Sequence, residues 1–339
     1  MREKVTINDV ARLAGVSKRT VSRVLNESPV VAKSSREKVQ RIISELGYQP
    51  NPQARGLAAS RSYLIGLVYD NPDPFFMESV IRGISSVCIE KGYELVIRPS
   101  DRTDPNLVDQ IINFVSRAQI DGVILPPPIS EMDAIAEELE ANGVPCVRLA
   151  AAQIDEPHRL VISDERSGAK QMTEYLINSG HSRIGYISGP KGLKSTWERR
   201  EGYLDALRSH DLEVDPDLLI RGAYTFESGV KAGRELLGAP QRPTAIFASN
   251  DQMAIGVVNA ARELGLTVPA DLSVAGFDDH ELAAQIIPSL TTIRRPVQLM
   301  ATLAAQKLIA TIDGHHDAAS DDCVLNPELV LRDSTAPIS

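Results

Sequence analysis

The sequence predicts a small all-α headpiece joined by a hinge segment to an α/β core of two doubly wound parallel sheets. Residues 6–26 carry two short apolar helical patterns separated by a glycine. From Tyr63 onward, short apolar strands alternate with helices, which is typical of parallel sheets covered on both faces. Basic residues are concentrated at the start of an otherwise acidic chain. At 339 residues, the chain is long enough for two or three domains.

The headpiece begins with a helix-turn-helix pattern. Thr6 is expected to cap the first helix, with Asp9 in its first turn, and Gly15 to end it in a left-handed conformation. The buried side is an apolar stripe with helical spacing: Ile7, Val10, Ala11 and Ala14. Ser17 is expected to cap the second helix, whose buried side contains Val21, Val24 and Leu25.

This arrangement leaves Lys18, Arg19 and Arg23 pointing outward. In a helix-turn-helix, the start of the second helix reaches base edges in the major groove of DNA. A short basic helix is more often only a solvated face, but here the charge is local. Residues 1–61 hold 12 Lys/Arg and 5 Asp/Glu, whereas the remainder holds 24 and 40. The imbalance predicts a polyanionic partner for the first residues alone.

A third helix and a linker complete this part of the chain. Ser34-x-x-Glu37 has the pattern of a capping box, and Gly47 is expected to end the helix. Its inner side would carry Val39, Ile42, Ile43 and Leu46. Beyond Gln49-Pro-Asn-Pro52, residues 51–59 are compatible with a brief helix that is too short to persist alone in water.

Two motifs in the headpiece carry a family resemblance. Thr6-Ile-x-Asp-Val-Ala-x-x-Ala-Gly-Val-Ser17 and Thr20-Val-Ser-Arg-Val-Leu-Asn26 resemble the signature of the LacI/GalR family of bacterial transcription regulators. The resemblance implies a homodimer on pseudo-palindromic operator DNA, with a hinge helix that folds only on the operator and a leucine wedge in the minor groove. Leu57 stands at the wedge position. The other expected DNA contacts are Lys18, Arg19 and Arg23 on bases, and Thr6, Ser17, Asn26, Asn51 and Ala54 on the backbone or in positioning.

The core pattern contains nine candidate strands and eight candidate helices. The strands are 64–69, 94–98, 122–125, 145–149, 160–163, 183–188, 218–221, 245–249 and 272–277. The helices are 75–90, 105–117, 131–141, 165–179, 197–210, 226–238, 251–264 and 297–312. This number of strands fits two similar halves with a cleft between them better than one sheet.

The resemblance also implies a periplasmic-binding-protein-like core whose chain crosses between halves near 162, 292 and 323. The expected domains are a headpiece (1–48), a hinge (49–61), a first half (62–162 and 293–322), a second half (163–292 and 323–333) and a tail (334–339).

Ligands of such sheets lie beyond the carboxyl ends of the strands. The residues there that resemble the family's effector contacts are Phe75, Asp164, Trp197, Arg199, Phe226, Asn250 and Asp278. Arg, Asn and Asp side chains can hold vicinal hydroxyls through paired hydrogen bonds, and aromatic rings can cover a sugar or a purine. For Asp164, helix capping is an equal alternative. Leu193 stands where purine-reading members place a second Arg, which favours a neutral sugar over a nucleobase.

Enzyme patterns are weak, because neither a nucleophile elbow nor a phosphate-binding glycine loop follows a strand. We expect no metal and no cofactor, although Asp278-Asp-His-Glu281 is a possible metal pattern. Cys88, Cys146 and Cys323 are expected to be reduced core thiols. The sequence has no apolar run of about 18 residues and no leader pattern, which predicts a cytoplasmic location. Together with the headpiece, this predicts a repressor that is associated with the nucleoid when it is bound to its operator. The alternatives are a sugar receptor of a transport system and a purine-responsive regulator of the same family.

Overall fold

A computed structural model describes residues 5–25, 30–48, 61–315 and 323–338. The chain divides into two compact units, Met1–Tyr63 and Leu64–Ser339, which are described separately. Among the helices within these ranges, none is long and apolar enough to span a membrane.

The first unit contains three helices around one small core: α1 (Ile7–Ala14), α2 (Lys18–Leu25) and α3 (Lys33–Leu46). Val10, Val21 and Val39, one from each helix, are fully buried. Thr6 donates its backbone N–H and its hydroxyl to Asp9 Oδ2 at 3.0 and 2.7 Å, which fixes the start of α1. Gly15 ends α1 with φ 61°, as the sequence predicts.

The predicted capping box at Ser34 is wrong. The third helix begins at Lys33 with Ala32 at the N-cap, and no side chain caps it. Ser34 and Glu37 are therefore already inside the helix. Val31 packs against the headpiece core just before the helix starts, and we attribute the entry point of the chain to this apolar contact rather than to a polar cap.

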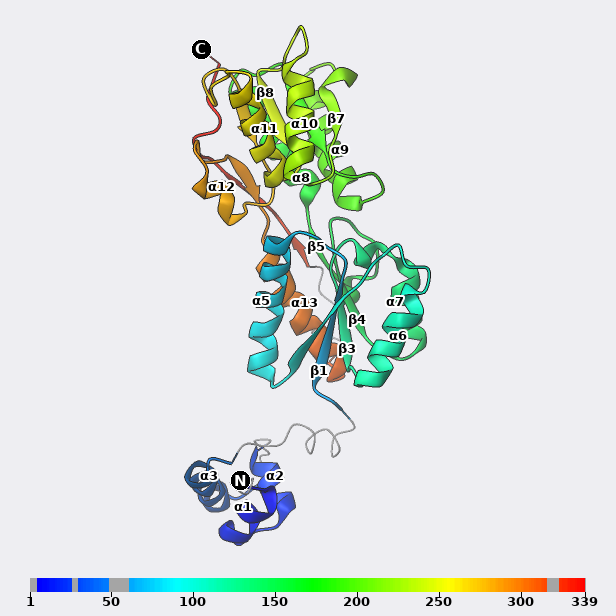
Figure 1. The fold of residues 1–339 in the computed structure, drawn as a ribbon. Helices are drawn as coiled ribbons and strands as arrows, with labels where there is room; N and C mark the ends of the chain where they lie inside the picture. Colours follow the sequence, from blue (N-terminus) through cyan, green and yellow to red (C-terminus); the bar gives the residue numbers. More distant parts are fainter. Residues whose placement is uncertain (1–4, 26–29, 49–60, 316–322, 339) are drawn as a thin grey trace. The chain divides into compact units, whose positions relative to one another are not determined.

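The first half of the second unit is built on a six-stranded sheet with the order β11-β5-β4-β3-β1-β2. Its strands are β1 (Leu64–Tyr69), β2 (Glu94–Pro99), β3 (Gly122–Leu125), β4 (Cys146–Ala150), β5 (Leu160–Ser163) and β11 (Val324–Leu325), all parallel. Two helices, α5 (Pro74–Lys91) and α13 (Val297–Ile312), pack together on one face. The other face is covered by α6 (Leu107–Ala118) and α7 (Asp133–Ala141) (Figure 1).

The second half is built on a four-stranded parallel sheet with the order β7-β6-β8-β9. The strands are β6 (Ile184–Ser188), β7 (Leu219–Arg221), β8 (Ala245–Ala248) and β9 (Ser273–Ala275). One helix pair is α8 (Glu165–Asn178) with α9 (Lys194–Ser209), and the other is α10 (Phe226–Leu237) with α11 (Asp251–Glu263). A short helix, α12 (Glu281–Gln285), follows β9. Every predicted strand and helix of the core therefore has a counterpart.

The end of the chain differs from the prediction. Val324 and Leu325 pair with β5 of the first sheet, so the last crossing falls after Leu325 rather than near residue 323. The chain then forms β12 (Glu328–Val330), which pairs antiparallel with β10 (Thr292–Arg294). Residues 334–338 are not a loose tail. Ser334 accepts from the Val274 N–H at 2.8 Å, and Ile338 donates to Ser179 at 2.9 Å, so this segment extends the second half.

Candidate functional site

A cavity of about 410 Å³ lies between the two halves of the core. Residues of both halves line it. From the first half come Asp70, Asn71, Asp73, Phe76, Arg102 and Glu131, and from the second come Leu193, Arg199, Tyr224, Asn250, Gln252 and Asp278. Arg295, which directly follows β10, also lines the cavity. Most of these residues lie just beyond the carboxyl ends of strands. In each sheet, the first strand lies between the next two strands of the chain: β1 between β2 and β3, and β6 between β7 and β8. Ligands of doubly wound sheets bind beside such a strand, where the strand order reverses.

The floor of the cavity is a buried ion cluster. Arg199 lies 2.7 Å from Glu165 and 3.1 Å from Asp278, and Arg295 lies 2.9 and 3.2 Å from the same two carboxylates. Glu165 is fully buried and Arg199 is 3% exposed. Burial alone would raise the pKa of Glu165, but the charges of Arg199 and Arg295 outweigh it and lower that pKa. The Arg199 guanidinium also stacks 4.0 Å from the Phe277 ring centroid, so its position is fixed on several sides.

Two residues at the start of α11 are held by local hydrogen bonds. Asn250 donates to the Tyr224 carbonyl and accepts from the Met253 N–H, both at 3.0 Å. Asp251 is fully buried and accepts from the Thr292 hydroxyl and the His280 N–H. Burial, with the nearby Asp278 charge, raises the Asp251 pKa to about 7.

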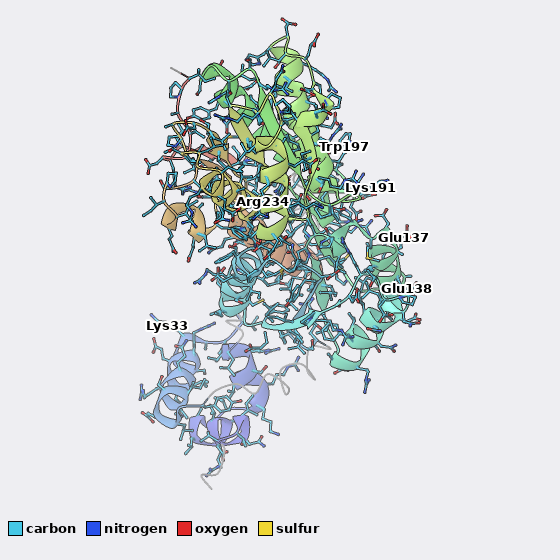
Figure 2. All side chains as sticks on the ribbon, turned by 45° about the horizontal axis from the view of Figure 1, so that its top comes forward. Lys33, Glu137, Glu138, Lys191, Trp197 and Arg234 are labelled. Atoms are coloured by element: carbon cyan, nitrogen blue, oxygen red, sulfur yellow. The ribbon has the colours of Figure 1, made fainter. Side chains whose placement is uncertain are left out.

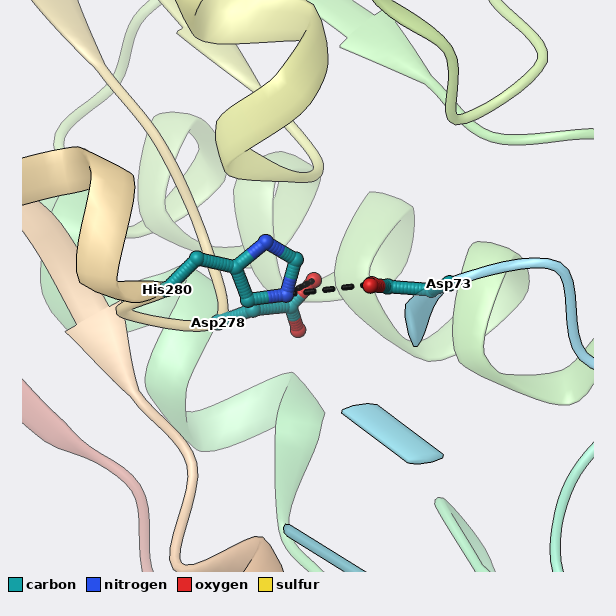
Figure 3. Close-up of side chains that lie close together, drawn as sticks. All are labelled: Asp73, Asp278 and His280. Atoms are coloured by element: carbon teal, nitrogen blue, oxygen red, sulfur yellow. Dashed lines mark ion pairs between the residues drawn. The ribbon is translucent and has the colours of Figure 1, made fainter. Parts of the chain in front are cut away.

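An ion pair joins the two halves beside the cavity (Figure 3). His280 Nε2 lies 3.0 Å from Asp73 Oδ2 and 3.9 Å from Asp278 Oδ2. Burial would lower the His280 pKa, but the hydrogen bond to Asp73 and the carboxylates around it raise that pKa to about 9. One ligand atom from each residue lies within 4.8 Å of the others, a spacing that a metal ion could use. The raised pKa of His280 favours an imidazolium that donates to Asp73.

A second contact between the halves involves Glu131. Both of its carboxylate oxygens accept from the Lys194 backbone N–H, at 3.0 and 3.2 Å. Burial raises the pKa of Glu131. The start of α9 is thereby tied to the loop that follows β3.

The structure brings three of the seven predicted effector residues to the cavity: Arg199, Asn250 and Asp278. The other four lie elsewhere. Phe75 packs 5.3 Å from the His280 ring outside this cavity, and Asp164 accepts from the Ser167 N–H as a helix cap. Trp197 is 51% exposed on the surface (Figure 2), and Phe226 is 38% exposed at the start of α10.

Sequence reasoning missed two aromatic residues at this site. Phe76 and Tyr224 line the cavity, one position after Phe75 and two positions before Phe226. Tyr224 has φ 62° and Asp278 has φ 113°. A non-glycine residue with positive φ is uncommon and is often found at a functional site. The strand ends predict these loops, but the residue pattern does not indicate which side chain of each loop points into the cavity.

The headpiece displays its basic residues as predicted. Lys18, Arg19 and Arg23 are exposed on α2, and Ser17 Oγ accepts from the Thr20 N–H at 3.1 Å. Thr6 is exposed beside the start of α1. Asn26, Asn51, Ala54 and Leu57 lie outside the described residues.

A helix-turn-helix with a basic second helix, followed by a two-halved core with a cavity at the strand ends, defines a ligand-responsive DNA-binding regulator. Residues 6–51 match the family described as "Bacterial regulatory proteins, lacI family", and residues 173–335 match "Periplasmic binding protein-like domain". The chain belongs to the LacI family of bacterial transcriptional regulators.

Relatives and solved structures agree along nearly the whole chain. The chain is 36% identical over 336 residues to the probable HTH-type transcriptional repressor ExuR of Bacillus subtilis, covering 97% of this chain and 98% of the relative. It is 37% identical over 334 residues to the HTH-type transcriptional repressor CytR of Escherichia coli, covering 97% and 96%. The structure of a lac repressor dimer bound to operator and the anti-inducer ONPF matches with a TM-score of 0.81, 31% identity and 98% and 100% coverage. A CelR–cellobiose complex matches with a TM-score of 0.73, 32% identity and 97% and 99% coverage.

Proposed function

We propose that this chain is a repressor whose operator affinity is set by an uncharged sugar bound in the cavity between the halves. It acts in the cytoplasm, on nucleoid DNA, and catalyses no reaction. The proposed domains are a headpiece (1–48), a hinge (49–61), a first half (62–162 and 293–325) and a second half (163–292 and 326–338). Lys18, Arg19 and Arg23 read bases, and Thr6, Ser17, Asn26, Asn51, Ala54 and Leu57 contact or position the DNA.

One observation carries the choice of ligand: every arginine that lines the cavity already faces a carboxylate. Arg102 lies 3.6 Å from Asp70, and Arg199 and Arg295 share Glu165 and Asp278. An anionic ligand would therefore find no free cation and would add charge to an acidic wall. Neutral hydroxyls can instead form hydrogen bonds with these charged groups without displacing them.

The sugar is held by Arg199, Asn250 and Asp278, with Asn71 and Gln252 as further polar partners. Phe76 and Tyr224 supply the apolar surface that Phe75 and Phe226 were expected to supply. The cellobiose complex among the structural neighbours supports a sugar in this position. Two aromatic residues in the lining also make a nucleoside the second candidate, because its base could stack on them while its ribose met the polar residues.

Calorimetry against neutral sugars, uronates, nucleosides and nucleobases tests the ligand. Neutral sugars should bind and uronates should not. Asp278→Asn should weaken sugar binding by about tenfold or more, the effect of about 1.4 kcal/mol. A wild-type protein that binds only a nucleobase would overturn the sugar assignment.

Operator binding tests the DNA-reading residues and excludes a transport receptor, which would have no operator. Arg23→Ala should weaken operator binding by about 1–3 kcal/mol and relax specificity at one base pair of each half-site. Equal losses on operator and random DNA would show that Arg23 contacts only phosphate. Leu57→Ala should reduce both operator affinity and bending, with sugar binding retained.

A further inference from the structure

We propose that the second half of the core carries another ligand site, which binds the phosphate group of a small phosphorylated metabolite. The site is a separate cavity of about 340 Å³ at the carboxyl ends of β6 and β7. This volume is within the range of small-molecule sites, about 300–1,000 Å³. Its position beyond the strand ends is where open parallel sheets bind ligands.

The charge of this cavity differs from that of the cleft. Lys191, Arg200 and Arg221 line it, and none of the described residues in its wall is acidic. Arg200 is paired with Glu201 at 2.9 Å. Lys191 and Arg221 are exposed, and neither has a carboxylate within ion-pair distance in the part of the chain that the structure covers. Two unneutralised cations on one wall attract an anion, and phosphate is the common biological anion that lysine and arginine bind.

The backbone and the buried wall of the cavity are also suited to an anion. The first turn of the 16-residue helix α9 contributes Thr196 and Trp197, so the positive end of the helix dipole is nearby, with the Lys194 N–H already bonded to Glu131. Gly192 has φ 92°, which brings the loop backbone to the cavity without a side chain. Tyr186 and Thr196, both buried, close the inner wall of the cavity.

Trp197 gives the site an apolar side for the rest of the metabolite. It is the single tryptophan of the chain, it is 51% exposed, and it lies with Lys191 on the surface of the second half (Figure 2). A hydrogen bond of 3.0 Å between Thr196 and Tyr224 separates this cavity from the cleft. The two cavities share Leu193 in their linings, but the cleft residues Arg199 and Asp278 are not in this wall, and Lys191 and Arg221 are not in the lining of the cleft, so each site can be tested by its own variants.

Trp197 fluorescence and calorimetry on the full chain test the proposal. The probes are inorganic phosphate, pyrophosphate and adenosine 5′-monophosphate, with adenosine as the uncharged counterpart, each titrated to about 1 mM or above, the range of a weak site. The phosphate-bearing probes should give a saturable fluorescence change, and added salt should weaken it. Lys191→Gln with Arg221→Gln should raise the dissociation constant at least tenfold.

Lys231→Gln is the matched control, because Lys231 is exposed on α10 outside this wall. It should bind the probes as the wild type does. Thermal unfolding and sugar binding should be unchanged in all variants, which separates this proposal from the function proposed for the cleft. No saturable signal with any phosphate probe, or equal binding by the double variant and the wild type, would overturn the site.

Discussion

Arg199 has a structural role in addition to its proposed contact with the ligand. Its guanidinium is 3% exposed between Glu165 and Asp278, and Glu165 is fully buried. Removing one member of a buried ion cluster leaves the other charges uncompensated. From the sequence, Arg199 was expected only to contact the ligand, and its burial in the ion cluster adds a structural role.

We therefore expect Arg199→Ala to lower the free energy of unfolding by about 3–5 kcal/mol, in addition to abolishing sugar binding. Urea denaturation of the full chain measures this loss. Asp278→Asn is the comparison, because it keeps the size of the side chain and its hydrogen-bonding oxygen. If Arg199→Ala is as stable as the wild type, Glu165 must have found another partner or become protonated.

His280 predicts a pH dependence of stability. Its pKa is raised from 6.5 to about 9, so the folded state holds the proton more tightly than the unfolded state does. This stabilisation is complete below about pH 6.5 and is lost as the pH rises towards 9. Asp73, Asp251 and Asp278 are the carboxylates that face the imidazole. The raised pKa of Asp251 also makes stability fall as the pH rises, but this contribution ends near pH 7, the pKa of Asp251 in the folded state.

The wild type should lose stability, on the order of 2 kcal/mol, between pH 7 and pH 9, and His280→Gln should not. Thermal unfolding across this interval is the measurement. A decline of equal size in His280→Gln would assign the effect to another group.

At the scale of secondary-structure elements, the close contact between helices α10 and α11 requires glycine at two positions. A Cβ at Gly229 would lie 2.2 Å from the Met253 carbonyl oxygen, and one at Gly256 would lie 2.4 Å from the Phe226 carbonyl oxygen. The two helices therefore cross at backbone contact, with no space for a methyl group. Their apolar faces were visible in the sequence, but this close approach was not.

Gly229→Ala should destabilise the second half by about 1–3 kcal/mol, because the helices must separate to accept the methyl group. Lys231→Ala, on the exposed side of the same helix, should have little effect. Urea denaturation of both variants provides the comparison. An unchanged midpoint for Gly229→Ala would mean that α10 can shift without loss of packing.

The sequence predicted the elements whose apolar pattern extends over several consecutive residues. Most of the core strands through β9 are short, mainly apolar runs between turn residues, and parallel strands of this kind are recognisable without knowledge of their neighbours. By contrast, β11 has only two residues, and its place in the first sheet depends on β5 being beside it. In the same way, the strand ends located the cleft, whereas the choice of Tyr224 over Phe226 depends on a backbone turn with positive φ.

At the scale of the whole core, the two halves are linked beside the cavity in which we propose that the ligand binds. The Asp73–His280 ion pair and the Glu131–Lys194 hydrogen bonds each join one half to the other, and Asp73 and Glu131 also line the cleft. A ligand that contacts these carboxylates changes the contacts between the halves. It can shift operator affinity only by its different affinity for the two arrangements, typically about 1–3 kcal/mol.

We expect the dimer that binds a two-fold operator to depend on an exposed apolar segment of the core. Ile287 is 95% exposed and Leu282 is 37% exposed, both in the segment that contains α12. Large apolar side chains in such positions mark association surfaces, and a lac repressor dimer is among the structural neighbours. We expect Ile287→Asp to weaken dimerisation by about 2 kcal/mol or more, since it would place an unpaired charge in an apolar contact.

Sedimentation at micromolar concentration should then show monomer for Ile287→Asp and dimer for the wild type. Operator affinity should fall with dimerisation, because two headpieces no longer reach the two half-sites together. Val214→Asp is the control, since Val214 is another exposed apolar residue, at 37%, but lies in the loop after α9. Sugar binding within each core should be unchanged in both variants. A stable dimer of Ile287→Asp would place the association surface on another face of the core.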